Sequence, residues 1–110
     1  MDVKTVKRLL ILLMFMSPLA LGQAPEFKLS IKEHRFTPSE IRVPANKKVR
    51  LLVSNEDATP EEFESHALNR EKVIPGRSSA TIFIGPLRPG RYPFEGEFNP
   101  ATAKGVVIAE

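Results

Sequence analysis

The sequence contains no cysteine, and its three methionines all lie within the first 16 residues. Without cysteine, no disulfide can stabilise the fold, so the hydrophobic core must supply that stability. Residues 17–110 therefore offer no sulfur ligand to a metal ion. The imidazoles are limited to His34 and His66, so a metal centre in this chain must take most of its ligands from oxygen donors.

Other absences narrow the range of functions. Residues 25–110 hold 13 Lys and Arg and 12 Asp and Glu, a net charge of +1, so no basic stripe indicates binding to nucleic acid. No Gly-rich phosphate-binding loop is present. Ser65 precedes His66, but adjacency in the sequence does not make a nucleophile and its base. The sequence therefore shows no readable catalytic nucleophile and no nucleotide-binding motif.

The first 24 residues have the three-part organisation of a secretory signal peptide. Three basic residues lie in the first eight positions, a continuous apolar run follows over residues 9–16, and residues 22–24 place small residues at a cleavage site. We expect residues 1–24 to be removed and residues 25–110 to form one exported domain. The alternative is an uncleaved membrane anchor. Its apolar stretch of about 13 residues would span only about 20 Å as a helix, short of the roughly 30 Å hydrocarbon core.

Ten prolines and six glycines separate short apolar runs, a pattern typical of an all-β domain. Phe27, Leu29 and Ile31 alternate with polar residues, as in a half-buried strand. Six further runs predict strands, at residues 41–43, 49–53, 63–68, 81–84, 91–94 and 106–108. A loop or a single helical turn is expected at residues 59–62. About seven strands with short loops favour a two-sheet β-sandwich, and an open barrel stays an alternative.

Two long segments resemble a known family. FTPSEIRVPANKKVRLLVSNED (residues 36–57) resembles the first half of the cupredoxins, and GPLRPGRYPFEGEFNPATAKGVVIAE (residues 85–110) resembles their closing hairpin. This resemblance implies a cupredoxin-like Greek-key β-sandwich for residues 25–110.

The copper ligands of the cupredoxins have no counterpart at the matching positions. By this resemblance, Gly96 stands at the position of the Cys and Asn99 at the position of one His. Ala103 or Lys104 falls near the position of the Met, and Glu64 or Ser65 falls at the position of the other His. A type 1 copper site needs a thiolate, two imidazoles and a weak axial ligand. Blue-copper electron transfer is therefore excluded. Since Glu64 matches a ligand position, we expect its carboxylate to point into the emptied pocket.

Shorter motifs indicate a narrower group. PEEFES, EKVIPG, GPLRPGRYPFEGEFN and TAKG resemble the cysteine-less cupredoxin-like proteins of bacterial periplasmic iron uptake. Those proteins partner a periplasmic ferrous-iron-binding protein and an inner-membrane permease, and they are thought to bind or oxidise the metal in transit. Members commonly have His after GEF, where this chain has Asn99. The resemblance implies a periplasmic protein, not itself membrane-spanning, that binds iron or copper and assists iron uptake through a partner permease.

Acidic residues are the main candidate metal ligands, because carboxylates suit hard cations. Glu62, Glu64 and His66 would share one face of an extended strand, and they would diverge if the segment turns. Glu95 and Glu97 likewise share a face of the closing hairpin, which the cupredoxin topology brings beside residue 64. Carboxylates ~4–6 Å apart raise each other's pKa unless a cation neutralises them. The sequence thus predicts these five residues as metal ligands.

Two alternatives stay open. Nearby basic residues could neutralise the same carboxylates in a surface network; they are Arg70, Lys72, Arg88, Arg91 and, beside Glu97, Lys104. The domain would then be a non-catalytic periplasmic interaction module without bound metal, whose contacts with a basic partner weaken in salt. A ferroxidase-type accessory activity is the other alternative, but with so few imidazoles a non-enzymatic role is favoured.

Overall fold

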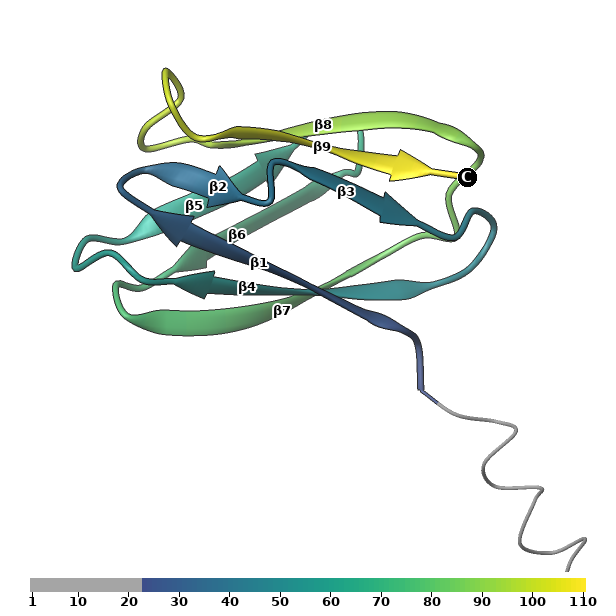
Figure 1. Cartoon of the computed structure of the whole chain (residues 1–110), viewed down its shortest axis with the longest axis horizontal. Helices are drawn as coiled ribbons and strands as arrows, with labels where there is room; N and C mark the ends of the chain where they lie inside the picture. The colour runs from purple at the N-terminus through teal and green to yellow at the C-terminus, as the bar shows by residue number, and fades with distance from the viewer. Residues whose placement is uncertain (1–22) are drawn as a thin grey trace, which may run out of the picture.

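The computed structural model describes residues 23–110, which form nine β-strands in two sheets packed face to face (Figure 1). One sheet has four strands in the order β2-β1-β4-β7, and the other has five in the order β3-β9-β8-β5-β6. The strands are β1 (Glu26–Lys32), β2 (Arg35–Thr37), β3 (Glu40–Val43), β4 (Val49–Asn55), β5 (Glu61–Ser65), β6 (Arg70–Ile74), β7 (Ser78–Ile84), β8 (Gly90–Gly96) and β9 (Lys104–Ala109). The predicted all-β sandwich is confirmed.

The core lies between the two sheets and is built by alternate residues of each strand. In β4, the side chains of Val49, Leu51 and Val53 are fully buried, and the residues between them are partly exposed. β4 pairs in parallel with β1 and antiparallel with β7. In the other sheet, β9 pairs in parallel with β3 and antiparallel with β8. Each sheet therefore combines a parallel pair with antiparallel neighbours.

Three phenylalanines pack together in the core beside β5 and β8. The Phe63 ring stacks on Phe94 with 5.0 Å between ring centroids, and Phe36 meets both rings edge-on. Gly105 leaves room for this arrangement, because a Cβ there would overlap the Phe94 ring. Phe63 lies in β5 and Phe94 lies in β8. The aromatic contact therefore holds together the two strands that carry most of the candidate acidic residues.

The structure differs from the sequence prediction in β2 and β6, two short strands that were not predicted. β6 lies at the edge of its sheet and buries only Ile74, so no apolar alternation marks it in the sequence. The strand predicted at residues 63–68 lies at Glu61–Ser65, and residues 66–69 form a turn. The helical turn suggested at residues 59–62 is therefore wrong, because Glu61 and Glu62 belong to β5.

The predicted signal peptide, residues 1–24, lies outside the described residues except for its last two. Its cleavage stays a prediction. Within residues 23–110, the structure has no helix with the length and apolar character needed to cross a membrane.

Replacing Phe63 by Ala should destabilise the domain strongly, because this side chain is fully buried and contacts two other aromatic rings. We expect the free energy of unfolding to fall by about 3–5 kcal/mol. Urea denaturation followed by circular dichroism measures this loss. Phe98, with 51% of its surface exposed, is the matched control. Phe98→Ala should change the unfolding free energy by less than about 0.5 kcal/mol, and equal losses for the two variants would contradict the described core.

Candidate metal centre

Strand β5 presents the acidic side chains. Glu61, Phe63 and Ser65 are buried, whereas Glu62 and Glu64 lie on the outer face of the five-stranded sheet and are partly exposed. This alternation follows from the two-residue period of a strand. The expectation that Glu62 and Glu64 share a face is therefore confirmed.

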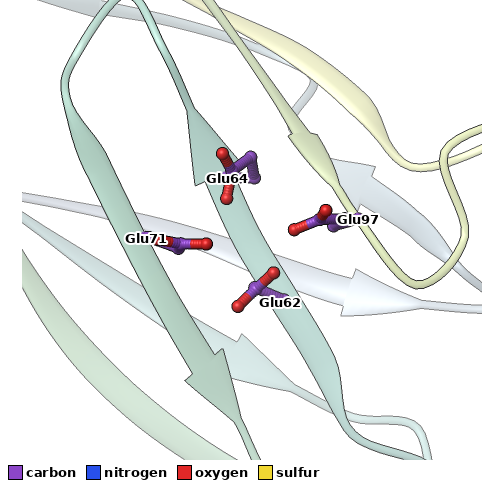
Figure 2. A group of neighbouring side chains, drawn as sticks. All are labelled: Glu62, Glu64, Glu71 and Glu97. Carbon is purple, nitrogen blue, oxygen red and sulfur yellow. The ribbon is translucent and has the colours of Figure 1, made fainter.

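Two further strands bring carboxylates to the same place. Glu71 in β6 is the cross-strand partner of Glu64. Glu97 directly follows β8, and its backbone N–H donates to the carbonyl oxygen of Glu62 over 2.9 Å. One carboxylate oxygen from each of Glu62, Glu64, Glu71 and Glu97 lies within 4.8 Å of the others. Figure 2 shows these four side chains gathered in one place. We call these four residues the acidic cluster.

Glu71 is the member of the acidic cluster that the sequence prediction missed. Its strand has exposed residues at four of five positions, so hydrophobic periodicity does not reveal it. The available signal was the short connection between Glu64 and Glu71. A tight turn between them makes two antiparallel strands, and residues at equal distances from such a turn face each other.

The crowding of the acidic cluster changes its protonation. A hydrogen bond with Glu97, followed by partial burial and the negative charges nearby, raises the pKa of Glu62 from 4.5 to about 7. Burial, followed by the neighbouring charge of Glu71, also raises the pKa of Glu64. The Oε2 atom of Glu64 is buried and has no hydrogen-bond partner. Glu62 and Glu64 therefore hold protons more strongly than ordinary carboxylates do, and Glu64 carries an oxygen with unused capacity to accept a bond.

Basic side chains do not neutralise the acidic cluster. Among residues 23–110, no Lys or Arg nitrogen lies within 4.0 Å of the four carboxylates. Arg70 and Lys72 share the face of β6 that buries Ile74, opposite to Glu71. The guanidinium of Arg70 instead donates to backbone carbonyl oxygens of Phe83 and Asn69. The salt network considered as an alternative therefore does not form ion pairs with these residues.

The other two predicted ligands lie beside the acidic cluster and not within it. β5 ends at Ser65, so His66 falls in the following turn with 97% of its side chain exposed; its Nε2 atom lies 3.8 Å from Oε1 of Glu64. Glu95 faces Glu64 across the strand pair and lines an adjacent cavity of about 370 Å³ with Lys104. Three of the five predicted ligands, Glu62, Glu64 and Glu97, are thus brought together.

The pocket beside Gly96 and Asn99 is filled by a residue that the sequence prediction did not assign to it. The carboxylate of Glu61 accepts a hydrogen bond from the side-chain amide of Asn99 over 2.7 Å. A Cβ added at Gly96 would lie 2.6 Å from Cδ of Glu61. The expectation that Glu64 points into this pocket is therefore wrong. Glu64 is three residues further along β5 and, unlike Glu61, faces outward.

Comparison with known proteins agrees with this architecture. Residues 6–109 match the family described as the cupredoxin-like domain. The chain belongs to this family. It is also 46% identical over 83 residues to an uncharacterised protein of Rickettsia prowazekii (strain Madrid E), a match that covers 76% of this chain and 66% of that protein. The chain thus spans just under two thirds of the length of that relative.

Solved structures show the same fold at low sequence identity. Auracyanin A, a blue copper protein from Chloroflexus aurantiacus, aligns with a TM-score of 0.69 and 12% identity, covering 80% of this chain and all of that one. An apo copper-binding protein aligns with a TM-score of 0.68 and 19% identity, covering 83% and 99%. The metal-binding domain of the copper-exporting ATPase CopA of Streptococcus pneumoniae D39 aligns with a TM-score of 0.66 and 13% identity, covering 77% and 84%. These likenesses establish the fold alone.

The cupredoxin-like domain therefore has two regions with different donor chemistry. The pocket beside Gly96 contains no thiolate, and the chain has none to offer, so it does not fit a type 1 copper ion. The outer face of β5, β6 and β8 carries only carboxylate oxygens within the acidic cluster. This donor set fits a hard cation.

The raised pKa of Glu62 predicts how the stability of the metal-free domain depends on pH. Because the pKa is about 7 in the folded protein and 4.5 ordinarily, the fold favours the protonated form. Its contribution is complete below about pH 4.5 and is lost as the pH rises through about 7. Thermal melts in chelator at constant ionic strength should show the Tm falling across this interval. Glu62→Gln should flatten the decline, and an unchanged slope in that variant would contradict the assigned coupling.

Proposed function

We propose that this cupredoxin-like domain is an exported, periplasmic metal-binding protein that carries iron or copper at the acidic cluster and assists iron uptake through a partner permease. One observation carries the binding role. Four carboxylates converge within 4.8 Å, and within residues 23–110 no Lys or Arg lies close enough to pair with them. A bound cation removes the repulsion that this arrangement otherwise maintains.

The spacing of the acidic cluster suits a single ion. Oxygen ligands lie ~2.0–2.6 Å from hard cations. Two ligands on opposite sides of such an ion are therefore separated by ~4–5 Å. The carboxylate oxygens of the acidic cluster approach one another within 4.8 Å, which is compatible with this geometry. The unpartnered Oε2 atom of Glu64 supplies an acceptor that needs no other bond to be broken.

The chemistry of the donors favours some metals over others. Carboxylates suit hard ions such as ferric iron, and a mixed set of carboxylates and imidazole suits ferrous or cupric ions. His66 lies next to Glu64 on an exposed turn, where its imidazole can join the carboxylates. The acidic cluster contains no soft donor, so cuprous ion is the poorest fit.

Exposure supports transient carriage of the ion. Glu71 and Glu97 are exposed, whereas Glu62 and Glu64 are partly buried. An ion can therefore enter and leave directly from solvent on the side of Glu71 and Glu97. The iron-uptake role, the periplasmic location and the two partners, a periplasmic iron-binding protein and an inner-membrane permease, are supported by the motifs in residues 60–65, 71–76 and 85–99.

Calorimetry tests the binding role directly. Residues 25–110 should bind Fe(II) under anaerobic conditions, or Cu(II), with a Kd below about 1 mM, the weak end for carboxylate sites. The double substitution Glu64→Gln and Glu97→Gln should raise this Kd by at least about tenfold, because it removes two ligands and their charges. Glu56→Gln, which removes an exposed carboxylate outside the acidic cluster, is the matched control and should bind as the wild type does. Unaltered binding by the double variant would reject the site.

A second function is favoured by the apolar side chains next to the acidic cluster. Val73, the cross-strand partner of Glu62, is 47% exposed, and Phe98, which follows Glu97, is 51% exposed. An acidic surface with exposed apolar neighbours suits a partner that has basic and apolar groups of its own. The domain would then act as a non-catalytic interaction module.

Retention of the partner permease on immobilised domain distinguishes the two functions. A metal carrier should retain the permease only when metal is present. An interaction module should retain it in chelator at about 0.05 M salt and lose it at about 0.5 M, because screening weakens charge contacts. Phe98→Ser should reduce retention by the module without changing the metal Kd. Retention that depends on metal, with no effect of Phe98→Ser, would reject the module.

A further inference from the structure

Glu61 is the buried carboxylate that the proposed metal site does not use. It is the first residue of β5, and only 1% of its surface is exposed. Among residues 23–110, no basic side chain lies within 4.0 Å of it. A buried carboxylate without a counter-ion is costly unless hydrogen-bond donors surround it. The segment that supplies these hydrogen-bond donors is therefore the segment that Glu61 holds in place.

Two of the three donors to Glu61 come from the turn that follows β8. Its Oε1 atom accepts from the backbone N–H of Phe98 over 2.8 Å, and its Oε2 atom accepts from the side-chain amide of Asn99 over 2.7 Å. The third donor is the backbone N–H of Glu62, which is 3.0 Å from Oε1. The carboxylate of Glu61 thus joins β5 to the residues that directly follow Glu97.

The surrounding backbone is shaped to fit this carboxylate. A Cβ at Gly96 would lie 2.6 Å from Cδ of Glu61 and 2.7 Å from Cβ of Ala103, so only glycine leaves space for the Glu61 side chain. The turn is closed on itself by backbone bonds from Asn99 N–H to the Gly96 carbonyl and from Ala103 N–H to the Asn99 carbonyl. A closed turn moves as a unit, so anchoring its Phe98 and Asn99 also anchors Glu97.

We propose that Glu61 is a positioning residue for the acidic cluster: its carboxylate clamps the turn at residues 96–99 onto β5 and so sets Glu97 against Glu62. Its role in metal binding rests on the function proposed above. Glu61 does not itself offer a ligand to the ion, because both of its oxygens already accept hydrogen bonds and it is sealed from solvent. The clamp acts in addition to the single backbone bond from Glu97 to Glu62.

Reversing the hydrogen bond between Glu61 and Asn99 tests the clamp. Glu61→Gln removes the charge and replaces one acceptor oxygen by an amide group, so Asn99 can bond to it only by rotating its own amide to present the oxygen, in a weaker contact without charge. Asn99→Asp places a second carboxylate against the first. Combining the two substitutions restores the bond with donor and acceptor exchanged. The double variant also has the same net charge as the wild type, because it loses the carboxylate at residue 61 and gains one at residue 99. Rescue by the pair separates the specific contact from a general loss of packing.

The first measurement is made without metal. In NMR spectra of the domain in chelator, each single variant should speed amide exchange at Phe98 and change the residual dipolar couplings of residues 97–99, and the double variant should recover both. Unchanged couplings in Asn99→Asp, which removes the donor facing the Glu61 carboxylate, would overturn the proposal. If Glu61→Gln does not fold, Asn99→Ala gives the same test, because it removes one donor and leaves the carboxylate in place.

The second measurement is the Kd for Fe(II), measured anaerobically. Each single variant should raise it by about 10- to 100-fold, the usual effect of residues that orient metal ligands, and the double variant should recover most of the loss. Val53→Ala, in the opposite sheet, controls for stability and should leave the Kd within about twofold. If the single variants change the residual dipolar couplings of residues 97–99 but leave the Kd for Fe(II) unchanged, the positioning role is overturned. If the wild type binds no metal, the proposed function fails, while the metal-free couplings still decide whether Glu61 sets the place of Glu97.

Discussion

The alternation of side chains along β5 is the constraint on which both the core and the acidic surface depend. Glu61, Phe63 and Ser65 point inward, while Glu62 and Glu64 point outward. The inward Phe63 stacks on Phe94 and so fixes β5 against β8. The same contact brings the residues after β8 to the outward carboxylates. A shift of one residue in the register would exchange the two sets, burying charge and exposing the aromatic ring.

The acidic cluster shows how a rigid sheet can hold like charges together. Strand pairing sets Glu64 opposite Glu71 regardless of what their side chains prefer. Isolated carboxylates at this separation would move apart in water, but here the backbone bonds of three strands hold them. The repulsion is instead relieved by proton uptake, seen in the raised pKa of Glu62, and a cation would relieve it further. A proton and a bound cation would therefore compete for the same oxygens.

The family's fold is preserved here without type 1 copper chemistry. The position that the resemblance assigns to the copper-binding Cys is Gly96, and the space beside it is occupied by the carboxylate of Glu61. Hydrogen bonds from Phe98 and Asn99 satisfy this carboxylate, so the pocket is closed by protein groups. Structural likeness to copper proteins at 12–19% identity therefore establishes only the arrangement of the strands. Which metal chemistry is possible depends on the side chains at the site.

The fold class, the lack of type 1 copper ligands and three members of the acidic cluster could be predicted from the amino-acid sequence. Strand periodicity and the lack of cysteine are local features, and the two-residue spacing of Glu62 and Glu64 puts them on one face of a strand. Glu97 was placed beside them by the resemblance to the cupredoxin topology. The tertiary structure alone decided that Glu71 joins them and that Glu61 lies beneath the turn. The place of Glu71 depends on the cross-strand register of β6, a strand too exposed to leave an apolar pattern in the sequence. The place of Glu61 depends on how the turn after β8 packs against β5. A buried glutamate and an exposed one are identical letters in a sequence, and only the strand's orientation in the sheet distinguishes them.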